Sequence, residues 1–560
     1  MSRRSNFAII DGKGTKNIKH FFCGSKFFTF HFLLFTFICT FAPMNKTKKA
    51  LLIVGMVLLA SPATRADDGL EYKVEMQTTV GSGDHSPLWL NANKYGLSSV
   101  DRNNGYLRAA LTRPLAADSL RQWGVGYGVD LAAAYNNTSS FIVQQAYFEG
   151  RWRKGVLTVG SKEMPMEMKN QELSTGSQVF GINARPIPQV RLAFPDYVNV
   201  PLTRRWLQFK GHISYGKFTD NGWQKDFADR SRYTQDVLFH GKSGFLKLAK
   251  PGSPFSIEAG MEMGCQFGGH SYDYNGEGYS ERNVNSVKLK SFIRALIPGG
   301  NDGDDQNPDQ NYKGADGNHV GAWLVRLNYE QPAWAVHVYG EHYFEDLSAM
   351  FQLDYDNYTT GSKWMEKHGN RFLLYDFKDM LLGAELNLKR QSWLNTVVFE
   401  YIYTKYQSGP IYFDHQKYMP DHLGGKDSYY LHYIYTGWQH WGQVIGNPLY
   451  RSPLYNTNGK IDVEDNRFYA FHLGFSGNPL PSLHYRLLGT LQKGFGTYVT
   501  PYDDPKRNTS LLAEAAWQLP KRIAKGWGVK LALGYDHGEL LGNNLGLQLS
   551  VVKSGSFSLH

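Results

Sequence analysis

The sequence predicts an all-β protein, a transmembrane antiparallel β-barrel with short helical segments in its loops, and three observations carry this prediction. Runs with an apolar residue at every second position recur along the chain, and roughly 16 to 18 can be counted, as in medium outer-membrane barrels. The chain contains 35 Tyr, 33 Phe and 13 Trp, many of them at the ends of such runs. After residue 66 no apolar stretch reaches the length of a spanning helix. A closed barrel is the other structure that satisfies every backbone group in lipid.

The run from Trp123 to Tyr135 shows the alternation most clearly. Its odd-numbered positions are Trp, Val, Tyr, Leu and Ala, whereas the even-numbered ones are Gly, Ala and Asp130. Successive strand side chains point to opposite sides, so one face is apolar and the other is small or polar. The apolar face ends in aromatic residues, as a lipid-facing strand does between two interfacial girdles. The small residues of the inner face leave room for a folded-in loop or for water.

The same period of two predicts strands near both ends of the chain. The runs with this period include residues 72–80, 207–215, 483–491, 509–517, 527–535 and 545–551. Short polar connections suited to hairpins separate the last of them. The final run nearly reaches the C-terminus, as expected of a last strand that closes against the first. A soluble β-sandwich or β-helix is the competing interpretation, and the aromatic residues at strand ends argue against it.

The excess of positive charge lies in the leader, which removes the usual argument for a nucleic-acid partner. The whole chain carries a formal net charge of +10. Residues 1–66 contain ten Lys and Arg but a single acidic residue, Asp11, so the remaining residues hold 50 basic and 49 acidic side chains. We therefore expect no nucleic-acid partner.

The leader contains the elements of a secretory signal peptide. A basic segment from Met44 to Lys49 precedes the apolar residues 50–60, and small residues follow at two candidate cleavage positions. We interpret residues 44–66 as the signal peptide and residues 67–560 as the outer-membrane β-barrel. The expected location is the outer membrane of a Gram-negative bacterium.

The residues before this signal peptide allow two interpretations. The simpler one is that translation starts at Met44 and that residues 1–43 are the leader of an over-extended gene model. The alternative is a genuine N-terminal membrane anchor formed by the Phe-rich run 27–42.

Cys265 is the single cysteine after the leader, because Cys23 and Cys39 lie within it. No internal disulfide can therefore form in the exported chain. Cys265 lies in an alternating run and is expected to pack on an apolar face rather than to act as a nucleophile.

Four segments do not resemble strands. Residues 164–178 are expected to contain a short helix inside a loop, and residues 286–297 fit either a strand or a helix. Residues 299–317 are rich in Gly, Asn and Asp and are expected to form an exposed loop. Residues 407–465 are the longest irregular region, of the kind that lies outside a bacterial barrel or folds into its lumen.

The motifs of common enzymes are missing, so we expect a protein that is not an enzyme and needs no cofactor. There is no G-x-S-x-G, phosphate loop, CxxC or HExxH. The acidic cluster Asn301–Asp305 lacks the spaced ligands of a calcium loop, and His337 and Glu341 share a strand face without a third ligand. No metal site is expected. A hydrolase with catalytic residues far apart in the sequence is the alternative.

The segment 429–442 has a composition suited to sugar binding, because flat aromatic side chains alternate with hydrogen-bonding ones. Aromatic faces stack on the C–H faces of sugar rings, and polar side chains bond their hydroxyl groups. The candidate polysaccharide-binding residues are Tyr429, Tyr433, Trp438, His440 and Trp441. The alternative is a strand end in an aromatic girdle, combined with the packing of a plug loop.

Several short blocks of the sequence resemble a known protein family. Residues Gly442–Leu449 read G-Q-V-I-G-N-P-L, which resembles the GxxIGNPL stretch of the Wzi family of capsule assembly proteins, in the form found in Bacteroides-type bacteria. Further blocks look like the same family and follow in the expected order: Gln145–Gly150, Val159–Glu163, Asn183–Pro188, Gly317–Gly321 and Gly340–Asp346. Each block is short, whereas the ordered set is more specific.

The resemblance implies an outer-membrane barrel of about 18 strands that binds capsular or surface polysaccharide as a non-catalytic lectin and helps to assemble the capsule. Family members are described as occluded by a helical element at the periplasmic end. Here an occluding helix would have to come from residues 164–178 or 286–297. The expected partners are the polysaccharide and outer-membrane lipid, and the protein is expected to be a monomer.

A passive outer-membrane porin is the alternative function. A porin conducts ions through an open lumen, whereas an occluded lectin-like barrel conducts almost none. The small inner residues of the run 123–135 are compatible with either.

Overall fold

The computed structural model describes residues 69–557 apart from residues 286, 298–316, 346–349, 351–360, 364, 367–377, 391 and 413–422. The predicted leader, 1–43, and the predicted signal peptide, 44–66, lie outside the described residues, as does the start of the predicted barrel domain at residue 67. The acidic cluster at residues 301–305 lies outside them as well. These interpretations stay predictions.

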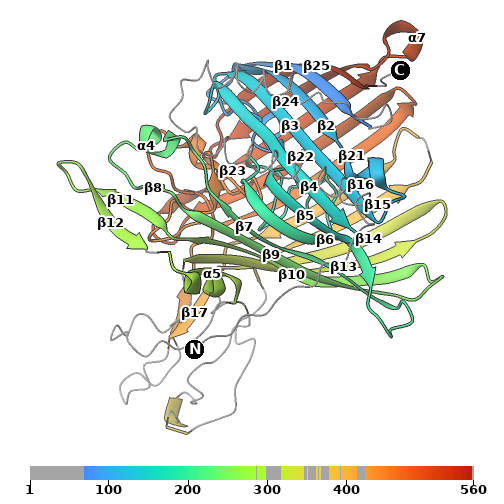
Figure 1. The fold of residues 1–560 in the computed structure, drawn as a ribbon. Helices are drawn as coiled ribbons and strands as arrows, with labels where there is room; N and C mark the ends of the chain where they lie inside the picture. Colours follow the sequence, from blue (N-terminus) through green and yellow to red (C-terminus); the bar gives the residue numbers. More distant parts are fainter. Residues whose placement is uncertain are drawn as a thin grey trace, which may run out of the picture. The chain divides into compact units, whose positions relative to one another are not determined.

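Eighteen antiparallel strands form one closed sheet, which confirms the predicted β-barrel of about 18 strands. Each barrel strand pairs with the next one along the chain (Figure 1). The ring closes between the first and last strands, from Glu71 opposite Ser556 to Ser82 opposite Leu545. The predicted closure of the last strand against the first is thus confirmed, and no barrel edge is left unpaired.

The elements have the following bounds. The barrel strands are β1 (Glu71–Ser82), β2 (Asn104–Arg113), β3 (Trp123–Tyr135), β4 (Phe141–Trp152), β5 (Gly155–Ser161), β6 (Gln189–Asn199), β7 (Leu207–Lys217), β9 (Leu238–Ala249), β10 (Phe255–Phe267), β13 (Asn318–Glu330), β14 (Trp334–Glu345), β15 (Met380–Leu388), β16 (Thr396–Tyr403), β21 (Phe468–Leu480), β22 (Leu483–Gly496), β23 (Pro501–Gln518), β24 (Trp527–Gly538) and β25 (Asn544–Ser556). The other described strands are β8 (Tyr233–Gln235), β11 (Gly269–Tyr274), β12 (Tyr279–Asn285), β17 (Ser408–Tyr412), β18 (Leu423–Lys426), β19 (Gln439–His440) and β20 (Gln443–Val444).

Short helical segments lie in the connections, as predicted. They are the helices α3 (Leu88–Asn91), α4 (Trp223–Phe227), α5 (Leu289–Leu296) and α7 (Lys521–Ala524) and the 3-10 turns η1 (Leu115–Asp118), η2 (Gly361–Lys363) and η3 (Pro453–Tyr455). Across the described part of the chain, no helix combines the length and the apolar character that a membrane crossing requires.

Strand β3 has the two faces that its alternation predicts. Trp123 and Tyr135 at its ends are 68% and 67% exposed, whereas Asp130 on the other face is 1% exposed. A Cβ atom on Gly128 would lie 2.6 Å from the ring of Tyr147 on the neighbouring strand. The inner glycines of β3 therefore make room for side chains of the adjoining wall.

The two ends of the barrel differ in the length of their connections. The connections at the short-turn end include two-residue turns between β4 and β5 and between β21 and β22. The long-loop end carries the connections 83–103, 162–188, 218–237, 268–317, 346–379 and 404–467. In Figure 1, α7 lies at the short-turn end, and α4, α5 and the β11–β12 hairpin lie at the long-loop end. Bacterial outer-membrane barrels have this asymmetry, with the long loops outside the cell.

The connection that contains α3 packs against the inner wall. The backbone N–H of Leu88 donates a hydrogen bond to Asp536 of β24 at 2.9 Å, and the indole N–H of Trp89 donates to Thr490 of β22 at 3.1 Å. Cβ atoms on Gly534 and Gly546 would lie within 2.8 Å of Leu90. Two wall glycines thus create the space that α3 occupies.

The connection 162–188 extends across the lumen to several other strands. The backbone N–H of Thr175 donates to Glu400 of β16 at 2.7 Å, and that of Gln178 donates to Glu341 of β14 at 2.8 Å. The carbonyl oxygen of Leu173 accepts a bond of 2.8 Å from His472 of β21. We call residues 83–103, 162–188 and 427–467 the lumen segments.

The helix predicted within residues 164–178 does not form, because this stretch consists of turns, bends and irregular backbone. Asn170 explains the turn, since its side-chain oxygen accepts the N–H groups of Glu172 and Leu173 at 3.0 and 2.9 Å. Within the ambiguous segment 286–297, residues Leu289–Leu296 form the helix α5. Neither of these two segments places a helix in the lumen, where the one described helix is the short α3 of the connection 83–103.

Helix α5 covers outward-facing residues of β7 and β10. Its Phe292 packs against Phe267 and Tyr215, and Tyr215 donates a hydrogen bond to the carbonyl oxygen of Phe292 at 2.7 Å. Cys265, in the same cluster, is completely buried. The predicted packing role of Cys265 is confirmed.

Candidate functional site

The last four residues of the predicted sugar-binding segment, 429–442, belong to a small hairpin of β19 and β20 within the third lumen segment, residues 427–467. Gln439 pairs with Val444 and His440 with Gln443, so Trp441 and Gly442 form a two-residue turn. Both turn residues have positive φ angles, 57° and 78°, as a tight turn of this type requires. The turn places Trp441 at the tip of the hairpin.

Trp438 is buried inside the barrel. It is 0% exposed, and its indole N–H donates to the carbonyl oxygen of Val179 at 2.9 Å. Its ring lies against β10, where a Cβ atom on Gly264 would overlap the indole. Trp438 therefore joins two lumen segments to the wall.

Tyr429 is equally buried. It is 0% exposed, and its hydroxyl group donates to Asp379 at 3.2 Å. The neighbouring Tyr430, which the sequence did not single out, stacks on Tyr450 with ring centroids 4.0 Å apart. These tyrosines form the core of the packed lumen.

His440 is also buried, and both ring nitrogens have partners. Its Nδ1–H donates to the carbonyl oxygen of Arg185 at 2.8 Å, and its Nε2 accepts the backbone N–H of Thr219 at 3.2 Å. Burial lowers the pKa of His440 to about 4. The imidazole is therefore neutral near pH 7 and holds two connections together.

Trp441 lies closer to solvent than Trp438 and is only partly buried. The guanidinium carbon of Arg185 lies 4.2 Å from the centroid of a Trp441 ring, a cation–π contact. Arg185 in turn donates to the hydroxyl group of Thr138 at 2.6 Å. The orientation of Trp441 is thus fixed from one side.

A small hollow of mixed aromatic and polar character lies beside Trp441 and His440, between the β7–β9 connection and the β19–β20 hairpin. Its lining includes Thr219, Asp220, Gln224, Thr234, Asp236 and Gln439. The side-chain oxygen of Gln224 accepts bonds from the Thr234 hydroxyl group at 3.1 Å and the Thr436 hydroxyl group at 2.9 Å. The hollow has a volume of about 20 Å³, which admits a single hydroxyl group and not a whole sugar ring. Carboxylate, amide and hydroxyl groups beside an indole are groups that can bond one sugar hydroxyl while the ring itself lies outside on the aromatic face.

Tyr433 is the predicted residue that is most open to solvent, with 64% of its surface exposed. Its carbonyl oxygen accepts a bond of 3.1 Å from Arg282 of β12. The small sheet of β8, β11 and β12 carries further aromatic residues, and Tyr233 and Tyr272 stack with centroids 4.9 Å apart. Tyr433 thus lies beside the β11–β12 hairpin at the long-loop end with its side chain open to solvent.

The five predicted residues thus occupy two different environments. Tyr429, Trp438 and His440 are buried and bonded within the chain, whereas Tyr433 and Trp441 reach the surface. The sequence did not indicate Asp220, Gln224 or Thr234, because their proximity to residues 436–441 arises from contacts across about 200 positions. No sequence pattern could have identified them.

In the described part of the chain, no group of three or more His, Cys, Asp or Glu residues is placed to hold a metal ion. His337 and Glu341 of β14, which share a strand face, each bond to a different partner. His337 bonds to Asn328 at 2.7 Å, and Glu341 forms an ion pair with Lys169 at 2.6 Å.

The fold and these segments define a class of protein: an 18-stranded β-barrel like those of Gram-negative outer-membrane proteins, with its own loops folded into the lumen. No protein-family model matches the chain, and no curated protein matches its sequence.

Among solved structures, the chain is similar to Wzi of Escherichia coli, described as an outer-membrane protein involved in group 1 capsule assembly and as a carbohydrate-binding β-barrel. The TM-score is 0.51 at 14% identity, covering 92% of this chain and 90% of that chain. For OccAB4 of Acinetobacter baumannii the TM-score is 0.41 at 10% sequence identity, and the match covers 87% of this chain and 98% of that chain. For OprD of Pseudomonas aeruginosa the TM-score is 0.40 at 10% sequence identity, and the match covers 87% of this chain and 95% of that chain. The likeness to Wzi is one of fold.

The contact between Gly264 and Trp438 gives a first test. Gly264→Val should destabilise the packed lumen by about 1–3 kcal/mol, because the added side chain overlaps the indole. Denaturant unfolding of the refolded barrel measures the change. The control is Gly150→Val, since a Cβ atom on Gly150 has no neighbour within 4 Å. Equal stability of the two variants would contradict the placement of Trp438.

Proposed function

We propose that the protein lies in the outer membrane with its long-loop end outside the cell and serves capsule assembly as a non-catalytic binder of surface polysaccharide. The observation that carries the proposal is the hollow beside Trp441, where an indole lies next to Asp220, Gln224 and Thr234. The ordered blocks that resemble the Wzi family and the likeness of fold to a carbohydrate-binding barrel support it.

In this proposal Trp441 and Tyr433 contact the saccharide directly. The indole face stacks on a sugar ring, and the polar groups of the hollow bond one of its hydroxyls. Tyr429, Trp438 and His440 act indirectly, because they hold the hairpin and its neighbouring connection in position. Each contact is weak, and a repeating polymer gains strength by engaging many barrels on one cell.

The packed lumen favours a binding role over passive transport. Residues 173–178 bond to β14, β16 and β21, and Asn447 of the third lumen segment donates to Thr175. These contacts place protein where a porin has water. No catalytic step is assigned to the site.

Removal of the two candidate aromatic side chains that reach the surface tests saccharide binding. Trp441→Ala should weaken binding to purified surface polysaccharide about tenfold, because one stacking contact is lost. Cells that carry Trp441→Ala together with Tyr433→Ala should release polysaccharide into the medium. The matched control is Trp206→Ala, since Trp206 is 50% exposed but lies in the β6–β7 connection at the short-turn end. Unchanged binding and unchanged cell-bound polysaccharide would refute the proposal.

Ion conductance distinguishes this function from that of a porin. The purified full-length protein in a planar bilayer should show almost no conductance, because the lumen segments fill the barrel. A variant lacking residues 164–184 should open a measurable channel if it folds, and circular dichroism checks the strand content. A steady open conductance of the unaltered protein would favour the porin and contradict the proposal.

A further inference from the structure

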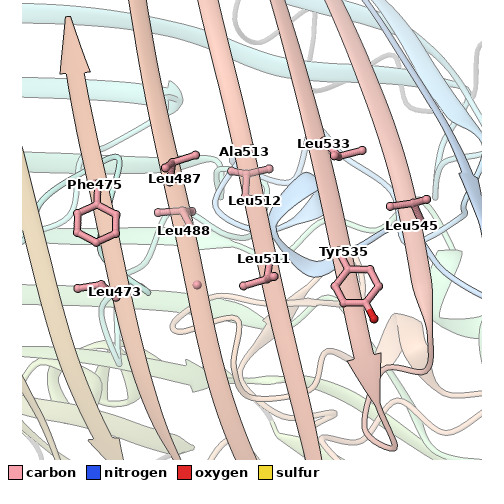
Figure 2. A pocket seen from close by; sticks show the side chains of 11 residues that line it. Leu473, Phe475, Leu487, Leu488, Leu511, Leu512, Ala513, Leu533, Tyr535 and Leu545 are labelled. Carbon is pink, nitrogen blue, oxygen red and sulfur yellow. The ribbon is translucent and has the colours of Figure 1, made fainter. Parts of the chain in front are cut away.

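The outer wall of the barrel carries an apolar hollow across β21, β22, β23, β24 and β25 (Figure 2). At its centre, Gly489 of β22 lies opposite Leu473 of β21 on one side and Leu511 of β23 on the other. A Cβ atom on Gly489 would meet a single neighbour, Cδ2 of Leu511 at 3.4 Å. The missing side chain thus leaves a depression between large apolar residues on the face that alternation directs to lipid.

Basic residues gather on the same wall, nearer the long-loop end. Lys493 of β22 lies opposite Arg507 of β23 in the strand register. The ring of Phe495 is 5.8 Å from the ammonium of Lys493 and 4.2 Å from that of Lys405. Beside them, the backbone carbonyl of Lys405 accepts a bond of 3.3 Å from Arg467. We call Lys405, Arg467, Lys493 and Arg507 the basic rim.

Within the described residues, none of the four cations of the basic rim forms an ion pair with a carboxylate. Four like charges, two on β22 and β23 and two in the adjoining β16–β21 connection, repel one another, and a bound anion relieves that repulsion. The basic rim is therefore suited to an anionic group.

The hollow and the basic rim are close enough to serve one ligand. Lys493 lies four positions after Gly489 on β22, which corresponds to about 13 Å along an extended strand. Since β22 runs toward the long-loop end, the basic rim lies where that end meets the membrane surface. The apolar hollow lies deeper, at the level of hydrocarbon.

We propose that this wall binds a membrane lipid with a phosphate-bearing headgroup. An acyl chain lies in the hollow over Gly489, and the phosphate lies at the basic rim. Arg467 and Arg507 offer planar guanidinium groups that match phosphate oxygens, and Lys405 and Lys493 add point charges. The proposal requires the barrel to lie in a membrane and is independent of saccharide binding at Trp441.

Native mass spectrometry of the full-length barrel in detergent tests the lipid site. Phosphatidylglycerol and phosphatidylcholine with identical acyl chains serve as probes. The unaltered protein should retain phosphatidylglycerol in preference to phosphatidylcholine. Lys493→Gln combined with Arg507→Gln should weaken phosphatidylglycerol binding about thirtyfold, because two cations at a membrane surface are removed. The control is Arg204→Gln with Arg205→Gln, two exposed cations at the short-turn end.

The hollow is tested separately with Gly489→Leu, which fills the depression. It should weaken binding of both lipids, whereas Gly150→Leu on another part of the outer wall should not.

Unchanged phosphatidylglycerol binding in both the Lys493→Gln, Arg507→Gln variant and the Gly489→Leu variant would overturn the proposal. Equal retention of the two lipids by the unaltered protein would also overturn it. If dextran sulfate binds at the basic rim and Gly489→Leu has no effect on lipid, the rim serves a soluble polyanion and the lipid site is wrong. Polysaccharide binding at Trp441 is unaffected by any of these results.

Discussion

The filled lumen depends on carboxylates that the barrel wall directs inward. Glu400 of β16 is 0% exposed and accepts bonds from the Ser174 hydroxyl group at 2.6 Å, the Thr175 N–H at 2.7 Å and the Tyr339 hydroxyl group at 2.6 Å. A buried carboxylate without such donors carries a large desolvation cost, and leaving a buried hydrogen-bonding group unsatisfied typically costs about 1–3 kcal/mol, or more if the group is charged. The wall and the lumen segment are therefore mutually dependent, because most of the donors to Glu400 come from residues 174–175.

Residues Gly442–Leu449, which stood out in the sequence because they resemble a stretch of the Wzi family, also have a structural role: they connect two lumen segments. Within Gly442–Leu449, Asn447 donates to Thr175 and to the carbonyl oxygen of Gly176, each at 3.0 Å. A Cβ atom on Gly446 would overlap the Tyr430 hydroxyl group, which itself bonds to Gln178. The I-G-N-P-L residues hold two lumen segments together. The same contacts support the hairpin that places Trp441 at the surface.

The barrel could be predicted from the sequence because each strand is specified by residues that are neighbours in the chain. Alternation in β3, the short polar turns and the final apolar run each specify a strand without reference to distant residues, and the structure has all three. The helix predicted at residues 164–178 failed for a local reason, since Asn170 closes a turn there. The burial of Tyr429, Trp438 and His440 could not be predicted from the sequence, because it depends on contacts between distant parts of the chain. Tyr430 and Gln178 are 252 positions apart, and composition alone does not reveal that an aromatic segment folds inward.

Hydrogen–deuterium exchange of the folded protein in detergent tests the central claim, that the lumen segments are part of the folded core. Backbone amides with buried partners exchange only when the surrounding structure opens. Residues 173–181 and 438–447 should exchange as slowly as the strands β14 and β16 that they contact. Exchange as fast as that of the exposed turn 275–278 would contradict the filled lumen and, with it, the positioning of Trp441.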